Sequence, residues 1–185
     1  EAIGFDAFKE TVQGVSTDSR NVRAGDLFVA IRGEKFDGHN FLTTAVQTGA
    51  AAVVADRRWA DANQTMIVSI HVPRLIVENT VHALGELARI HRRKFRIPVI
   101  AVGGSNGKTT TKEMIRHVLG QKFNVLATEG NLNNHIGVPQ TLFRLEKNHK
   151  AAVVEIGTNH FGEIRYLCEI LEPTHGLVTN IGHEH

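Results

Sequence analysis

The sequence predicts an α/β protein with two domains, the second of which contains a mainly parallel sheet. Short apolar segments of strand length alternate with segments of helical periodicity along most of the chain. A glycine-rich loop at residues 103–107 joins an apolar strand to a helix. A basic cluster at residues 91–96 separates two such alternating series, and we therefore expect domains at residues 1–96 and 97–185.

Composition excludes several classes of protein. Of the 185 residues, 42% are hydrophobic and 22% are charged, which is typical of a folded globular chain. No apolar segment of the sequence approaches the roughly 20 residues that a membrane span requires. The net charge of +2 gives no electrostatic support for nucleic-acid binding. The single cysteine, Cys168, and the lack of a visible signal peptide favour a cytoplasmic location.

The first domain is expected to alternate strands and helices. Apolar runs predict strands at residues 27–31, 51–55 and 75–77, and periodicity predicts helices at residues 41–48 and from Thr80 onward, with Thr80 as the cap. The polar loop at residues 32–40 is either a binding loop or a solvated connection. The basic cluster that ends the second helix is most simply a solvated last turn, whose cations suit a helix C-terminus.

The glycine-rich loop resembles a site for a nucleoside triphosphate. The apolar run at residues 98–102 predicts a buried strand, and Met114, Ile115, Val118 and Leu119 predict one face of the following helix. Backbone N–H groups of such a loop bind phosphate, Lys108 can reach the terminal phosphates, and the Thr109 hydroxyl can bind magnesium. The usual loop has glycine where this chain has Val102, and the alternative is a glycine-rich turn with an exposed lysine.

Polar residues follow the later strands as well. Strands are predicted at residues 124–128, 151–157 and 176–181, with a helix that contains Ile164, Leu167, Cys168 and Leu171 before the last of them. Glu155 ends the middle strand, where it is either a magnesium ligand or a surface carboxylate. The asparagine-rich loop at residues 129–139 holds turn formers or ligand-binding amides, and His183 and His185 are metal ligands or exposed histidines.

Four segments of the second half, in this order, resemble the motifs of the Mur ligase family. They are residues 104–110 (GSNGKTT), 130–134 (GNLNN), 155–160 (EIGTNH) and 180–185 (NIGHEH). In the first half, residues 18–20 (DSR), 25–30 (GDLFVA) and 33–39 (GEKFDGH) resemble the UDP-binding domain of the family. The paired asparagines and the Asn-His after Glu155 resemble the members that add D-alanyl-D-alanine to UDP-N-acetylmuramoyl-tripeptide, although His135 stands where those members have an acidic residue.

The resemblance implies a small UDP-binding α/β domain followed by the truncated start of a P-loop ATPase domain. It also implies ATP and Mg²⁺ as cofactors, and UDP-N-acetylmuramoyl-peptide and D-alanyl-D-alanine as substrates in peptidoglycan precursor synthesis. The implied ATP-binding residues are Gly104, Ser105, Asn106, Gly107, Lys108, Thr109 and Thr110, and the implied catalytic residues are Lys108, Glu155 and His185. The implied metal ligands are Thr109, Glu155 and His185, and the implied substrate-binding residues are Ser19, Arg20, Glu34, Lys35, Phe36, Asn133 and Asn134.

Two other functions stay open at this point. A relative that adds the third residue to UDP-N-acetylmuramoyl-dipeptide would share the phosphate loop, and a non-catalytic nucleotide-binding module could retain the loop without the reaction. Glu155 and His185 argue against the module, because a binding module needs no second metal site. Since the rest of the family's ATPase domain and its C-terminal domain would follow His185, we expect this chain alone to lack ligase activity.

Overall fold

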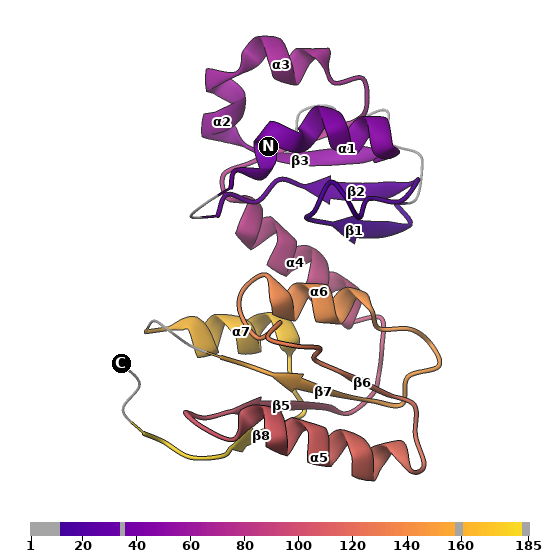
Figure 1. The fold of residues 1–185 in the computed structure, drawn as a ribbon, viewed down its shortest axis with the longest axis vertical. Helices are drawn as coiled ribbons and strands as arrows, with labels where there is room; N and C mark the ends of the chain where they lie inside the picture. Colours follow the sequence, from indigo (N-terminus) through magenta and orange to yellow (C-terminus); the bar gives the residue numbers. More distant parts are fainter. Residues whose placement is uncertain (1–11, 34–35, 158–160, 183–185) are drawn as a thin grey trace. The chain divides into compact units, whose positions relative to one another are not determined.

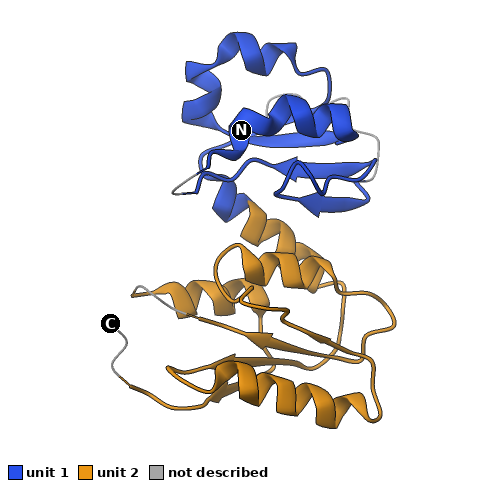
Figure 2. Cartoon of the chain, in the orientation of Figure 1, with its two compact units in different colours: residues 1–83 blue, residues 84–185 orange. Residues whose placement is uncertain are grey.

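The computed structural model describes residues 12–33, 36–157 and 161–182. The chain forms two compact units, residues 1–83 and 84–185, and the division between them falls within α4 (Thr80–Arg92) (Figures 1 and 2). Each unit has a parallel sheet of its own, which confirms the predicted α/β fold class. The domain boundary at residue 96 stays a prediction. Among the described residues, no helix is long and apolar enough to cross a membrane.

The first unit is built on a four-stranded parallel sheet with the order β1-β2-β3-β4. The strands are β1 (Gly14–Ser16), β2 (Asp26–Val29), β3 (Ala52–Asp56) and β4 (Arg74–Val77). The helices are η2 (Gly38–Phe41), α1 (Leu42–Thr48), α2 (Arg57–Ala62) and α3 (Gln64–Ser69). No prediction was made of β1, α2 or α3, because they are only three to six residues long and too short for a periodic pattern to appear.

A buried histidine connects the polar loop of the first unit to its core. His39 is 1% exposed and stacks on Trp59, with ring centroids 4.9 Å apart. Its Nε2 accepts a hydrogen bond from the Asp56 backbone N–H at 2.9 Å, so Nδ1 carries the proton that is donated to Asp37. Asp37 also accepts from the His39 N–H, and the hydrogen bonds from His39 and Arg32 outweigh its burial and lower its pKa. His39 therefore anchors the second half of the polar loop to the core of the first unit.

The second unit is built on a parallel sheet with the order β6-β7-β5-β8. The strands are β5 (Val99–Gly103), β6 (Val125–Ala127), β7 (Ala151–Glu155) and β8 (His175–Val178). The helices after α4 are α5 (Lys108–Gly120), α6 (Gly137–Phe143) and α7 (Glu163–Leu171). Both faces of this sheet carry helices, and Figure 1 shows α6 and α7 on the opposite side from α5.

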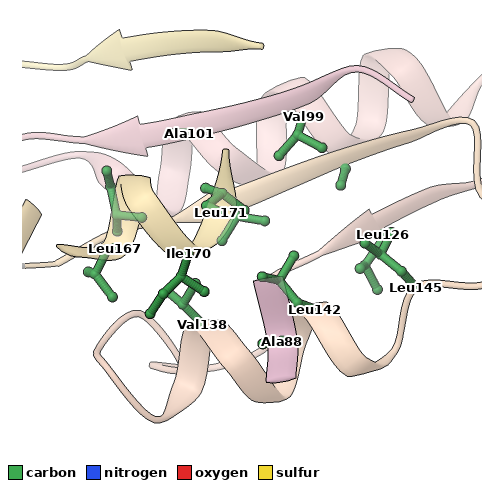
Figure 3. Packing of buried hydrophobic residues seen from close by; sticks show 13 residues of the cluster. Ala88, Val99, Ala101, Leu126, Val138, Leu142, Leu145, Leu167, Ile170 and Leu171 are labelled. Carbon is green, nitrogen blue, oxygen red and sulfur yellow. The ribbon is translucent and has the colours of Figure 1, made fainter. Parts of the chain in front are cut away.

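The main core of the second unit lies between the sheet and the helices α4, α6 and α7. Ala88, Leu142 and Leu171, one from each helix, are fully buried against strand residues such as Val99 and Val154 (Figure 3). On the other face of the sheet, the predicted helix α5 is present, but Met114 and Val118 of its predicted apolar face are 65% and 72% exposed. The residue of α5 that is buried is a lysine, Lys112.

Three local predictions are corrected by hydrogen bonds. The cap of α4 is Asn79, whose Oδ1 accepts from the His82 N–H at 3.0 Å, whereas Thr80 lies inside the helix and is buried. Strand β8 ends at Val178 and not at residue 181, since the next residues bond to the phosphate loop. Residues 137–139 belong to α6 and not to a loop, and the N–H of its first residue, Gly137, donates to Asn134 Oδ1 at 2.9 Å.

The basic cluster is not a wholly solvated helix end. Arg92 is 7% exposed and its guanidinium donates to the carbonyls of Phe95, Leu171 and Glu172. The last two carbonyls lie at the C-terminus of α7, where backbone acceptors are left without helical partners. Arg93 forms an ion pair with the Glu172 carboxylate, and this hydrogen bond lowers the pKa of Glu172. The cluster therefore joins α4 to the end of α7.

Candidate functional site

The glycine loop follows β5 and takes a conformation that requires glycine at two positions. Gly104 has φ of 124°, and a Cβ there would lie 2.2 Å from Thr179 Oγ1. Gly107 has φ of 79° and is the N-cap of α5. Val102, the departure from the usual loop pattern, is a fully buried residue of β5. The loop thus begins two residues after Val102, and the shorter motif Gly104-x-x-Gly107-Lys108-Thr109 is sufficient to form it.

A segment from the end of β8 supports the loop from outside. The Asn106 N–H donates to Asn180 Oδ1 at 2.9 Å, and the Ser105 N–H donates to the Asn180 carbonyl at 3.2 Å. The Ser105 hydroxyl accepts from the Gly182 N–H at 2.9 Å. The sequence assigned no role to Asn180 itself, and the signal for it was its position at the start of the fourth motif that resembles the Mur ligase family, residues 180–185.

The first turn of α5 faces the loop. Within the described structure, no side chain caps this helix, so its N-terminal N–H groups suit an anion. Lys108 begins the helix, and its ammonium donates to the carbonyls of Gly104 and Ser105. Thr109 and Thr110 follow in the same turn and are exposed. The seven residues that were predicted to bind ATP therefore lie in this loop and in the first turn of α5.

Glu155 lies beside this turn. The parallel register pairs Glu155 with Val102, which places the carboxylate at the strand ends next to the loop. Glu155 is 3% exposed, and its two carboxylate oxygens accept from Thr109 Oγ1 at 2.8 Å and from Asn133 Nδ2 at 2.9 Å. Among the residues that the structure describes, no lysine, arginine or histidine forms an ion pair with it. Since a buried carboxylate without a cation is costly, the site suits a bound cation.

The donor set fits magnesium together with phosphate. Mg²⁺ takes oxygen ligands in octahedral geometry at about 2.1 Å, so neighbouring ligands lie about 3 Å apart. Thr109 Oγ1 and Glu155 Oε2 are 2.8 Å apart. Among the described residues, no group of three or more acidic, histidine or cysteine side chains is placed to hold a metal ion. His185, the third predicted ligand, lies outside the described residues.

The two predicted asparagines have different surroundings. Asn133 contacts Glu155, and its carbonyl accepts from the Gly157 N–H at 2.8 Å, which ties the asparagine loop to the end of β7. Asn134 Oδ1 accepts from the N–H groups of Ile136 and Gly137 at 3.0 and 2.9 Å, as a helix cap does. Asn133 therefore lies in the site beside Glu155, whereas the Asn134 side-chain oxygen accepts hydrogen bonds from the backbone at the start of α6.

Three of the residues predicted for the UDP end, Ser19, Arg20 and Phe36, follow strands of the first unit's sheet. Ser19 and Arg20 follow β1, and Phe36 lies between β2 and η2. Ser19 is buried, Phe36 is 75% exposed, and Arg20 forms an ion pair with Asp18 at 2.6 Å. The hydrogen bond from Arg20 lowers the pKa of Asp18. Because β1 and β2 are neighbouring parallel strands, their following loops share one edge. Glu34 and Lys35 lie outside the described residues.

Comparison with known proteins agrees with these motifs. A model described as Mur ligase family, catalytic domain matches residues 11–92, and one described as Mur ligase middle domain matches residues 102–185. The UDP-N-acetylmuramoyl-tripeptide–D-alanyl-D-alanine ligase of Synechocystis sp. is 45% identical over 94% of this chain. The ligase of the same name from Escherichia coli is 43% identical over 95% of this chain. The chain spans 37% of the length of each.

Solved structures give the same result. A crystal structure of MurF from Acinetobacter baumannii matches with a TM-score of 0.84 and 39% identity, over 94% of this chain and 37% of that one. MurF ligase from Thermotoga maritima, in complex with ADP, matches with a TM-score of 0.80 and 34% identity, over 92% of this chain and 38% of that one. The resemblance inferred from the motifs is confirmed, and the chain belongs to the Mur ligase family.

Proposed function

We propose that this chain is part of an ATP- and Mg²⁺-dependent ligase that joins D-alanyl-D-alanine to UDP-N-acetylmuramoyl-tripeptide. The observation that carries the proposal is Glu155, a buried carboxylate without an ion-pair partner among the described residues, held by Thr109 of the phosphate-loop helix. A nucleotide-binding loop alone does not need such a carboxylate. The names of the relatives supply the substrates.

In this proposal the loop and α5 hold the nucleotide phosphates. The N–H groups of the first turn of α5 bind phosphate oxygens, and Lys108 exchanges a loop carbonyl for the phosphoryl group that is transferred. Thr109 and Glu155 would hold Mg²⁺, which neutralises charge on the phosphates when it is bound. Asn133 keeps the Glu155 carboxylate oriented toward Thr109. Catalysis then depends on positioning and charge neutralisation, without a covalent enzyme nucleophile.

The reaction has two steps. The free carboxylate of the UDP-linked peptide takes the terminal phosphoryl group of ATP and releases ADP, which gives an acyl phosphate. The amine of D-alanyl-D-alanine then attacks the acyl carbon, and the tetrahedral intermediate releases inorganic phosphate and a proton as the amide forms. Lys108 and the α5 N-terminus stabilise the charge on the transferred group in the first step. His185 is proposed as a further metal ligand, and Asn134 as a contact to the sugar or peptide.

The first domain, residues 1–96, is proposed to hold the UDP end of the substrate. Ser19, Arg20 and Phe36 would contact it, together with Glu34 and Lys35. Arg20 suits a diphosphate because its guanidinium donates several hydrogen bonds in a fixed plane. We place the reaction in the cytoplasm, where ATP is available and a lone cysteine such as Cys168 stays reduced.

The test is phosphate release by the full-length protein that carries this chain, with ATP, Mg²⁺ and UDP-N-acetylmuramoyl-tripeptide. We expect release that depends on D-alanyl-D-alanine. Release with UDP-N-acetylmuramoyl-dipeptide and a single diamino acid instead would contradict the assignment within the family. The 185-residue chain, assayed alone, should show no turnover, and turnover at the rate of the full-length protein would contradict that expectation.

A further inference from the structure

A buried lysine lies beneath the candidate site. Lys112 follows Lys108 and Thr109 by about one helical turn and is 1% exposed, although it belongs to a helix whose other residues are partly or fully exposed. Its ammonium donates to the Thr128 carbonyl at 2.7 Å and forms an ion pair with Glu113 at 2.9 Å. Lys112 thereby connects α5 to the residue that follows β6.

Burial of this ammonium is not explained by stability. Desolvating a charged group is costly, and a buried ion pair often contributes no more than an apolar residue of the same shape. The partner carboxylate lies near the surface, since the Glu113 side chain is 40% exposed, and the hydrogen bond from Lys112 lowers the pKa of Glu113. A methionine could fill the same space without the cost of desolvation.

Thr128 continues the connection to Glu155. Thr128 is 1% exposed, and its hydroxyl oxygen accepts from the Glu155 backbone N–H at 2.9 Å. The Glu155 side chain in turn accepts from Thr109, which lies three residues before Lys112 on the same helix. These bonds form a closed path from α5 through Lys112, Thr128 and Glu155 back to α5.

We propose that Lys112 and Thr128 are positioning residues that set the separation between the Thr109 hydroxyl and the Glu155 carboxylate, and thereby the affinity of the site for a divalent cation. The inference rests on the proposed function, since it assumes that these two oxygens bind the cation. Lys112 fixes α5 against Thr128, and Thr128 fixes the backbone of Glu155. Residues that orient metal ligands in this way typically change metal affinity by about 10–100-fold when they are replaced.

The experiment measures binding of Mn²⁺ to the full-length protein in the presence of ADP, from the electron paramagnetic resonance signal of free Mn²⁺. The variants are Lys112→Met, Thr128→Val and Thr128→Ser, and the control is Lys122→Met, which removes an exposed lysine that follows α5. Valine keeps the shape of threonine without its hydroxyl, whereas serine keeps the hydroxyl. Thermal unfolding and the affinity for ADP without metal are measured for each variant.

We expect Lys112→Met and Thr128→Val to weaken Mn²⁺ binding by about tenfold or more, and Thr128→Ser and Lys122→Met to change it by less than about twofold. The affinity for ADP without metal should not change. Folded Thr128→Val protein with the wild-type affinity for Mn²⁺ would overturn the inference, as would equal losses in the valine and serine variants. If Lys112→Met does not fold, the comparison of Mn²⁺ affinity between Thr128→Val and Thr128→Ser decides whether the inference holds. Wild-type protein that binds no Mn²⁺ with ADP would instead refute the proposed function.

Discussion

The candidate residues of the two units are held in different ways. In the first unit, all hydrogen bonds that Arg20 donates to side chains of described residues go to Asp18, two residues away. In the second unit, Glu155 bonds to Thr109 and Asn133, which are 46 and 22 residues away, and Asn106 bonds to Asn180 across 74 residues. The geometry of the second site therefore depends on the whole fold of its unit, whereas Arg20 depends mainly on a local turn.

This difference predicts different consequences of substitution. A change in the second site should alter a position at which two elements meet, because each side chain joins two of them. A change at Arg20 should remove one contact to a ligand and leave the unit intact.

Glu155→Gln should lower phosphate release by the full-length protein by about 100-fold or more, because the amide cannot replace the charge of a metal-binding carboxylate. The melting temperature without metal should stay the same or rise, since a buried charge without an ion-pair partner in the described structure is removed. Glu146→Gln, at an exposed glutamate, is the control. Activity of Glu155→Gln within about threefold of the wild type would refute the role of Glu155.

Gly104→Ala should abolish measurable ATP binding in calorimetry. A Cβ at this position meets Thr179 Oγ1 at 2.2 Å, and the φ of 124° is strained for any residue with a side chain, at about 1–3 kcal/mol. Gly120→Ala is the matched control, because no atom lies within 4 Å of its added Cβ. Equal ATP affinity in the two variants would show that the loop does not hold the phosphates.

Arg20→Ala should weaken binding of UDP-N-acetylmuramoyl-tripeptide to this chain by about 5- to 30-fold in calorimetric titration, which corresponds to about 1–2 kcal/mol for one charge-assisted contact. UDP alone should show a similar loss. Arg23→Ala is the control. Arg23 is also exposed, but it precedes β2 and so lies at the amino-terminal end of the strands, whereas Arg20 follows β1. The melting temperature should not change in either variant, and equal losses of affinity in both would contradict a specific role for Arg20.

The smallest effect concerns His91 and acid stability. Burial lowers the pKa of His91, and this outweighs its contact with the Leu145 carbonyl. Because the unfolded chain takes up the proton first as the pH falls below about 6.5, the stabilisation present at higher pH is lost as the pH falls further. His91→Gln should therefore lose less stability than the wild type between pH 7.5 and 5.5, measured by urea unfolding. His71→Gln, at an exposed histidine, should follow the wild type.

Local patterns were enough to predict the main strands and the phosphate loop. The first four residues of β3, β5 and β7 are all apolar, and the glycines of the loop mark its turn. Glu155 could be placed near the loop because parallel strands end at one edge of a sheet. Asn180, Thr128 and Lys112 could not be predicted, since their roles arise from hydrogen bonds between distant elements.

Which residue of α5 is buried could not be predicted, for a related reason. Periodicity grouped Met114 and Val118 on one apolar face of the helix. It could not indicate that the helix buries Lys112 instead, with its ammonium bonded to the Thr128 carbonyl. Similarly, Arg92 belongs to a basic run that suits a solvated helix end, and only the approach of α7 buries it. Charged residues that are buried by tertiary contacts carry no local sign of their burial.

The most direct test of the account is the position of the metal. Crystals of the full-length protein with ADP and Mn²⁺ should give an anomalous scattering peak within about 2.3 Å of both Thr109 Oγ1 and a Glu155 carboxylate oxygen. That result would establish the two oxygens as ligands of one cation beside the phosphate loop. A bound Mn²⁺ whose peak contacts neither side chain would contradict the central claim.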